Sequence, residues 1–173
     1  TAVREQLILG LGSLSLRLAD RPDMQSEIVE FFQLLCHLPP ESFQHLAEPA
    51  LSIVMRIVDS DPPFLHGTEI WPHYFTVLGL AGRSHSCGPY SFSLLTSIVR
   101  PNAILFPLDF YAEYVDLLNG FISSALKKSS EFSGPPVSNP GSGSSSPVTE
   151  NSPVDLARRA LQIFSELESN ILR

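Results

Sequence analysis

The sequence predicts an all-α fold in which antiparallel helical hairpins stack as a HEAT-like α-solenoid. Apolar residues recur at steps of three and four positions, which is the period of an α-helix. Helix-start signals precede most of these stripes, and the breaks between them are rich in Pro or Gly. We find no convincing strand alternation and no Asn-Gly or Asp-Gly hairpin, so short links should join antiparallel helices.

The first two helices are predicted over Ala2–Ala19 and Asp23–His37. The first carries one leucine stripe, and its two glycines, Gly10 and Gly12, would let a neighbouring helix approach closely. The start of the second helix is marked at 20–23 by an Asp cap, a Pro in the first turn and a second acid. The second helix is apolar over more than half its circumference, so we expect neighbours on two sides. The leucine stripe of the first helix consists of Leu7, Leu11, Leu14 and Leu18.

The third and fourth helices are each introduced by a Pro-rich break. The third begins at Pro40, and Pro49 inside its stripe should kink it or split it in two. A second break at 59–63 separates it from a fourth helix over Glu69–Ala81, for which Thr68 is a plausible cap.

Three further helices complete the pattern. The fifth begins at Gly88-Pro89, and its stripe extends to Val99, before Pro101 ends it. The sixth begins at Pro107 and runs to Lys127-Lys128, where basic residues suit the negative end of a helix. The seventh begins at Ser152 with a capping box and runs to the last residue of the sequence.

Composition divides the chain into three parts. Residues 1–128 hold about six helices of the repeat array, and 152–173 hold a further helix of the same solenoid. Residues 129–151 are rich in Ser, Pro and Gly and have almost no apolar side chains, so we predict a disordered insertion there. Pro40-Glu41-Ser42-Phe43 is echoed by Pro89-Tyr90-Ser91-Phe92, near the period of about 40–47 residues of HEAT units. A compact helical bundle is the alternative.

Charge and hydropathy limit the classes of partner. The formal net charge of −7 disfavours direct binding to nucleic acid and favours proteins, basic ones among them. Hydrophobic residues make up 43% of the chain and charged residues 17%, so we expect the rest of a parent chain to cover some apolar surface. No stretch predicts membrane insertion. Two cysteines, Cys36 and Cys87, are too few for a disulfide framework, which predicts reduced thiols and a cytoplasmic or nuclear location.

The residue types that carry catalysis or bind metals do not form a recognisable site in the sequence. The five histidines form no HxxxH pair and the two cysteines no CxxC pair, so no metal site is predicted. Gly10-Leu11-Gly12 begins like a dinucleotide-binding turn, but Ser15 stands where the third Gly should be and no βαβ pattern surrounds it. We therefore predict neither an enzyme nor a cofactor. The histidines are His37, His45, His66, His73 and His85.

Two groups of residues are candidates for protein contact or modification. Trp71, Tyr74 and Phe75 form the densest aromatic patch, which belongs either to the core or to an exposed groove for a peptide partner. Ser146 and Ser152 each precede a Pro, so proline-directed kinases could phosphorylate them; a plain solvated loop is the alternative.

A resemblance suggests a narrower function. The turn Asp20–Asp23 and the core motif Glu30–Leu35, followed by a Pro-led helix, resemble repeats of the importin-β superfamily of nuclear transport receptors. The similarity covers residues 20–58 and implies a HEAT solenoid that binds cargo and the small GTPase Ran on its concave surface. It assigns no residue to either contact. The helical regions of large Arf-type exchange factors in membrane traffic are similar too, and a regulatory region of such a factor is the alternative.

Overall fold

The computed structural model describes residues 2–60, 65, 67–84, 86–100, 103–131 and 153–171, and these form an all-α fold, as predicted. Two single-turn helices precede α2 and α6, namely η1 (Pro22–Met24) and η3 (Leu108–Phe110), and two short strands form a small hairpin, β1 (Val99–Arg100) and β2 (Ala103–Ile104). The α-helices are α1 (Ala2–Arg17), α2 (Gln25–Cys36), α3 (Pro40–Asp59), α4 (Trp71–Gly82), α5 (Gly88–Ser97), α6 (Tyr111–Glu131) and α7 (Pro153–Ile171).

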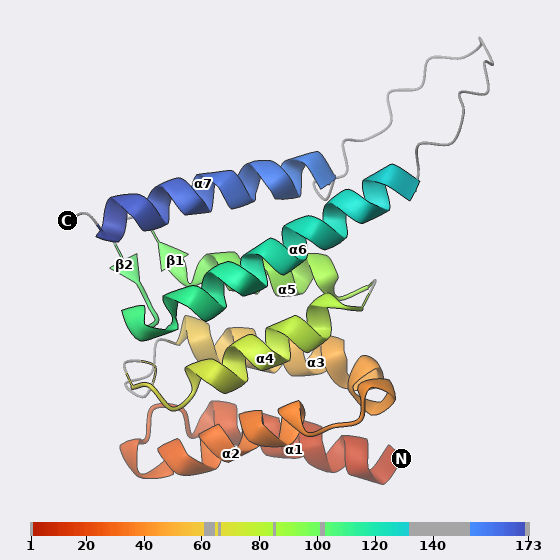
Figure 1. Ribbon diagram of the computed structural model, residues 1–173. Coiled ribbons are helices and arrows are strands. Elements are labelled where there is room, and N and C mark those ends of the chain that lie inside the picture. Colours follow the sequence, from red (N-terminus) through yellow and green to blue (C-terminus); the bar gives the residue numbers. More distant parts are fainter. Residues whose placement is uncertain are drawn as a thin grey trace, which may run out of the picture.

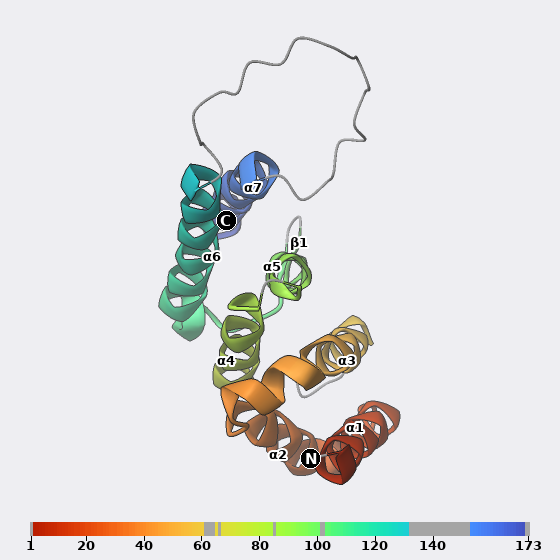
Figure 2. The same ribbon diagram turned by 90° about the vertical axis from the view of Figure 1, so that its right-hand side faces the viewer.

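The helices stack from α1 and α2 at one end to α6 and α7 at the other (Figure 1). Figure 2 shows them in two rows, with α1, α3 and α5 in one row and α2, α4 and α6 in the other. Helix α3 packs on both α1 and α5, while α4 packs on both α2 and α6. Each helix therefore contacts the next of its own row as well as a helix across the stack.

Helix α1 packs through a different face from the one its leucine stripe suggested. Leu7, Leu11 and Leu14 are exposed, whereas Ile8 and Gly12 are buried. The buried face has no room for a side chain at position 12, because a Cβ there would lie 2.6 Å from the ring of Phe31 in α2 and 3.0 Å from Ile53 in α3. The bare backbone of Gly12 lets both neighbours approach, as the sequence predicted, although the leucines point elsewhere.

Pro49 lies inside a continuous α3. The helix bends without splitting, and its change of direction is visible in Figure 2. A proline removes one backbone hydrogen bond and crowds the preceding turn, which accounts for a bend at this point. The predicted limits of α2 and α4 agree with the structure to within about two residues.

The hairpin after α5 is a structural feature that the sequence pattern did not predict. The sequence pattern places Val99 in the fifth helix, but α5 ends at Ser97. Val99 instead pairs with Ile104 in an antiparallel register, and Arg100 pairs with Ala103. A β-branched residue close before a proline disfavours helix, which explains why the helix ends early. Helix α7 contacts both strands as well as α6.

The limits of the predicted insertion shift slightly. Helix α6 continues to Glu131, three residues beyond the predicted end at Lys128, and α7 begins at Pro153. Residues 132–152 lie outside the described residues, and the candidate phosphorylation sites Ser146 and Ser152 are among them.

Candidate functional site

The aromatic patch of α4 is part of the core. Trp71 and Tyr74 are fully buried and Phe75 is 6% exposed, so these rings do not line an exposed groove and the packing interpretation describes them. Trp71 and Phe75 each contact Phe106 edge-on, and Phe106 stacks on Tyr114 of α6 with 4.8 Å between ring centroids. The patch had suggested a contact surface because aromatic residues favour both cores and interfaces, and sequence alone does not separate the two.

The polar atoms of these rings are satisfied inside the protein. The indole N–H of Trp71 donates to the carbonyl oxygen of Leu65 at 3.0 Å. The hydroxyl of Tyr74 donates to the carbonyl of Leu94, and that of Tyr114 to the carbonyl of Leu95. Burial raises the pKa of both tyrosines above the ordinary value, so both stay neutral and serve as structural donors.

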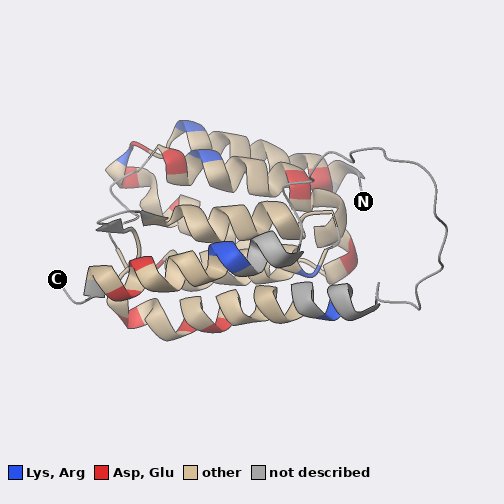
Figure 3. Ribbon diagram, turned by 90° about the horizontal axis from the view of Figure 1, so that it is seen from above, with Lys and Arg blue, Asp and Glu red and all other residues tan. Residues whose placement is uncertain are grey.

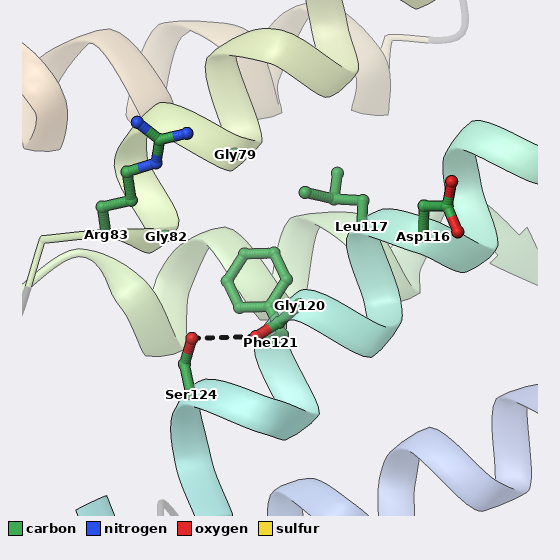
Figure 4. Close-up of a pocket in the computed structure, with 8 residues that line it drawn as sticks. All are labelled: Gly79, Gly82, Arg83, Asp116, Leu117, Gly120, Phe121 and Ser124. Atoms are coloured by element: carbon green, nitrogen blue, oxygen red, sulfur yellow. Dashed lines mark hydrogen bonds between the residues drawn. The ribbon is translucent and has the colours of Figure 1, made fainter. Parts of the chain in front are cut away.

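An exposed groove lies instead on the outer side of the α4 and α6 pair. It encloses about 220 Å³ and is lined by Gly79, Gly82 and Arg83 of α4, and by Asp116, Leu117, Gly120, Phe121 and Ser124 of α6. Figure 4 shows Leu117 and Phe121 between the two helices, with Arg83 near one end and Asp116 near the other. Apolar side chains thus form the middle of the groove and opposite charges stand at its ends.

Glycines give this groove its shape. A Cβ at position 82 would lie 2.6 Å from the Phe121 ring, so Gly82 allows that ring to rest against the backbone of α4. A Cβ at position 120 would meet nothing within 4 Å, which leaves the α6 backbone open to the groove. The Ser124 hydroxyl donates to the carbonyl of Gly120 at 2.8 Å, the bond drawn in Figure 4.

The charged groups at the groove ends are available to a partner. Arg83 and Asp116 are both exposed, and the ion pair found within the described chain joins Arg21 to Asp23 at the other end of the stack. In the described part of the chain, charged residues are spread along the helices and do not gather into one basic surface (Figure 3). A partner with a complementary pair of charges would satisfy Arg83 and Asp116 together.

A second hollow lies between α3 and α5. It encloses about 380 Å³ and is lined by Glu48, Ser52, Ser86, Cys87 and Tyr90. The Tyr90 hydroxyl lies 3.2 Å from the sulfur of Met55. This hollow is larger, but its lining side chains carry a carboxylate and three hydroxyls, whereas the middle of the α4 and α6 groove is formed by Leu117 and Phe121, so that groove is the better candidate for an apolar contact.

Three of the five histidines considered as possible metal ligands lie within the described residues. Within the described residues, no three His, Cys, Asp or Glu side chains converge as metal ligands would. His37 and His45 are exposed, and His73 shares a 3.3 Å contact with the amide of Gln33. His66 and His85 lie outside the described residues.

The thiol of Cys36 should react slowly in the folded protein. Its S–H donates to the carbonyl of His73, and burial raises its pKa from 9.0 to about 11. A higher pKa leaves less thiolate, about 100-fold less at pH 8, and the thiolate is the nucleophile. Iodoacetamide labelling at pH 8, followed by peptide mass spectrometry, should modify Cys36 at least about 100-fold faster in the denatured chain. Equal rates in the two states would contradict the pKa assignment.

The sequence pattern does not reveal the residues that line the groove. Leu117 and Phe121 belong to the apolar stripe of the predicted sixth helix, which does not indicate an opening beside them. The available signal was Gly79 inside the predicted fourth helix and Gly82 just after it, because paired small residues permit close approach. That signal does not say whether a neighbouring helix or a partner fills the space.

Comparison of the chain with family models, with curated proteins and with solved structures gives no match. Among the described residues, no helix is both long and apolar enough to cross a membrane. Functional inference therefore rests on this chain's own residues.

Proposed function

We propose that this chain is a protein-binding scaffold of helical-repeat type, not an enzyme, and that the groove between α4 and α6 holds a segment of its partner. The observation that carries the proposal is the half-buried apolar centre of that groove, formed by Leu117 and Phe121 beside the bare backbone of Gly79 and Gly120. The two-row stacking of antiparallel helices supports a HEAT-like solenoid, which presents such surfaces to partners.

The size of the groove fits a side chain better than a cofactor. Pockets for small molecules and cofactors usually enclose about 300–1,000 Å³, and this groove encloses about 220 Å³. One large apolar side chain of a partner would fill it, between Leu117 and Phe121. Arg83 would meet an acidic group of the partner at one end, and Asp116 a basic group at the other.

The narrower form of the proposal is a nuclear transport receptor that binds cargo and Ran, acting in the cytoplasm and nucleus. The turn and the core motif that resemble the importin-β superfamily support it. Purified Ran loaded with a non-hydrolysable GTP analogue should bind the chain, whereas Ran loaded with GDP should bind much more weakly. Equal retention of the two forms, or of neither, would remove the transport role and leave the scaffold proposal intact.

Gly120→Leu should block the groove without harming the fold. The new side chain meets open space, and replacing Gly in a helix gains up to about 1 kcal/mol of stability, so the melting temperature should not fall. Asn119→Leu, on an exposed neighbouring residue that does not line the groove, is the matched control. Binding should fall for Gly120→Leu and stay unchanged for Asn119→Leu.

The partner itself can be found by site-specific photo-cross-linking. A photoreactive residue at Ser124 lies in the groove, whereas one at the exposed Ser123 lies outside it. Cross-links made from position 124 and not from 123 should map to one short partner segment with an apolar side chain, and Gly120→Leu should abolish them. Identical cross-links from both positions would show that the groove is not the contact.

A further inference from the structure

Most of the exposed large apolar side chains among the described residues lie on one helix. Six large apolar side chains are exposed in that part of the chain, and four of them belong to α1. The four are Val3, 71% exposed, Leu7, 69%, Leu11, 38%, and Leu14, 51%. A surface of this kind, concentrated on one face of a helix, is typical of an interaction site.

These side chains form a seam with the spacing of a coiled coil. Val3, Leu7, Gly10 and Leu14 follow one another at steps of four, three and four, which places them on one face. Gly10 lies in this seam, and a Cβ there would meet nothing within 4 Å. Packing inside the chain therefore does not require a glycine at position 10, whereas it does at position 12.

We propose that this seam binds the same seam of a second copy of the chain, in an antiparallel arrangement with twofold symmetry. In one register Leu7 of each copy lies opposite Leu14 of the other, and the flanking residues Leu11 and Leu18 lie opposite Gly10 and Val3. The N–H of Leu18 donates to the carbonyl of Leu14, so the helical geometry continues to that residue. Leu11 of each copy fills the space above Gly10 of the other.

The neighbouring surfaces favour this occupant over others. The solvent side of α2 carries Ser26, Glu27 and Glu30, so a helical hairpin stacked over both α1 and α2 would bury two carboxylates. A single helix on α1 avoids that cost. At the other end of the stack, the exposed side chains described for α7, over 158–170, are polar apart from Leu161, so this stretch offers a head-to-tail array no apolar counterpart for the seam.

The dimer continues an interface that already exists within the chain. Helix α5 packs on α3 and α3 packs on α1, and α1 of the second copy extends this row across the twofold axis. The seam is about 24 Å long, from 16 residues at about 1.5 Å each. One helix covers less than the roughly 800 Å² per partner of a standard interface, so we expect a weak dimer that forms only at high protein concentration.

Sedimentation equilibrium of the full chain, from dilute to near-millimolar concentration, tests the proposal. The wild type should fit a monomer–dimer equilibrium, and the double variant Leu7→Glu with Leu14→Glu should raise the dissociation constant about 100-fold, because carboxylates would be buried in the seam. Gln6→Glu with Ser13→Glu adds the same charge to exposed positions of α1 outside the seam and should change the constant by less than about twofold.

Gly10→Leu separates association from folding. The monomer has room for the side chain, so the melting temperature should hold or rise, while the dissociation constant should rise at least about tenfold because Leu11 of the second copy loses its space. A chain that stays monomeric throughout, that dimerises equally well with glutamates at both leucines, or that assembles without limit would overturn the proposal.

Discussion

Trp71→Ala should lower the free energy of unfolding by about 3–5 kcal/mol, the usual cost of removing a large buried aromatic side chain. The Trp71 ring is fully buried and contacts Tyr74, Phe75 and Phe106, so no neighbour can collapse into the space without losing its own contacts. Loss of the indole N–H also leaves the carbonyl oxygen of Leu65 without its hydrogen-bond donor. Because domains are stable by only about 5–15 kcal/mol, the variant should be close to unfolding at ambient temperature.

Urea denaturation followed by circular dichroism measures this loss. Trp71→Phe keeps an aromatic ring and should lose less than Trp71→Ala, since only part of the volume and one hydrogen bond disappear. Leu161→Ala is the control for a large apolar side chain, because Leu161 is 70% exposed and its loss should change stability by no more than about 0.5 kcal/mol. If Trp71→Ala behaved like Leu161→Ala, the ring would not be buried in solution.

Gly12→Leu and Gly10→Leu should have opposite effects, although they make the same change on the same helix. At position 12 the first added carbon already lies within 2.6 Å of the fully buried Phe31 ring, so the variant should lose about 3 kcal/mol or fail to fold, the upper part of the range for overpacking. At position 10 the space is open, and the better helix propensity of Leu should add up to about 1 kcal/mol.

Thermal melts at low protein concentration, where the chain is monomeric, should show this contrast directly. Gly12→Ala gives a milder version that still folds, with a melting temperature below that of the wild type. Equal melting temperatures for the two leucine variants would mean that α1 does not dock through Gly12.

The helical character of the chain was predictable because it depends on local signals. Prolines stand at or shortly before the starts of most helices, and the apolar period identified α2 and α4 to within about two residues. The hairpin at Val99–Ile104 was not predictable in this way, because two-residue strands are too short to show alternation. Helix α7 contacts both strands from a distant part of the sequence, and no local pattern indicates that contact.

The face that a helix buries was harder to predict. In α1 the sequence offers a leucine stripe, but the helix docks through Ile8, Gly12 and Ser15, because the neighbouring side chains of α2 and α3 are large enough to fill the space above a glycine. The groove residues were missed for a related reason. Leu117 and Phe121 look like core residues in sequence, and only the position of α4 across from them leaves an opening.

The tyrosine hydroxyls that donate to consecutive carbonyls of α5 have a mechanical consequence for the groove between α4 and α6. Tyr74 belongs to α4 and Tyr114 to α6, and they donate to the carbonyls of Leu94 and Leu95 in the last turn of α5. The two helices that line the groove are thus hydrogen-bonded to adjacent residues of α5. We therefore expect the opening to keep its width when the proposed partner binds, so that no binding energy is spent on setting that width.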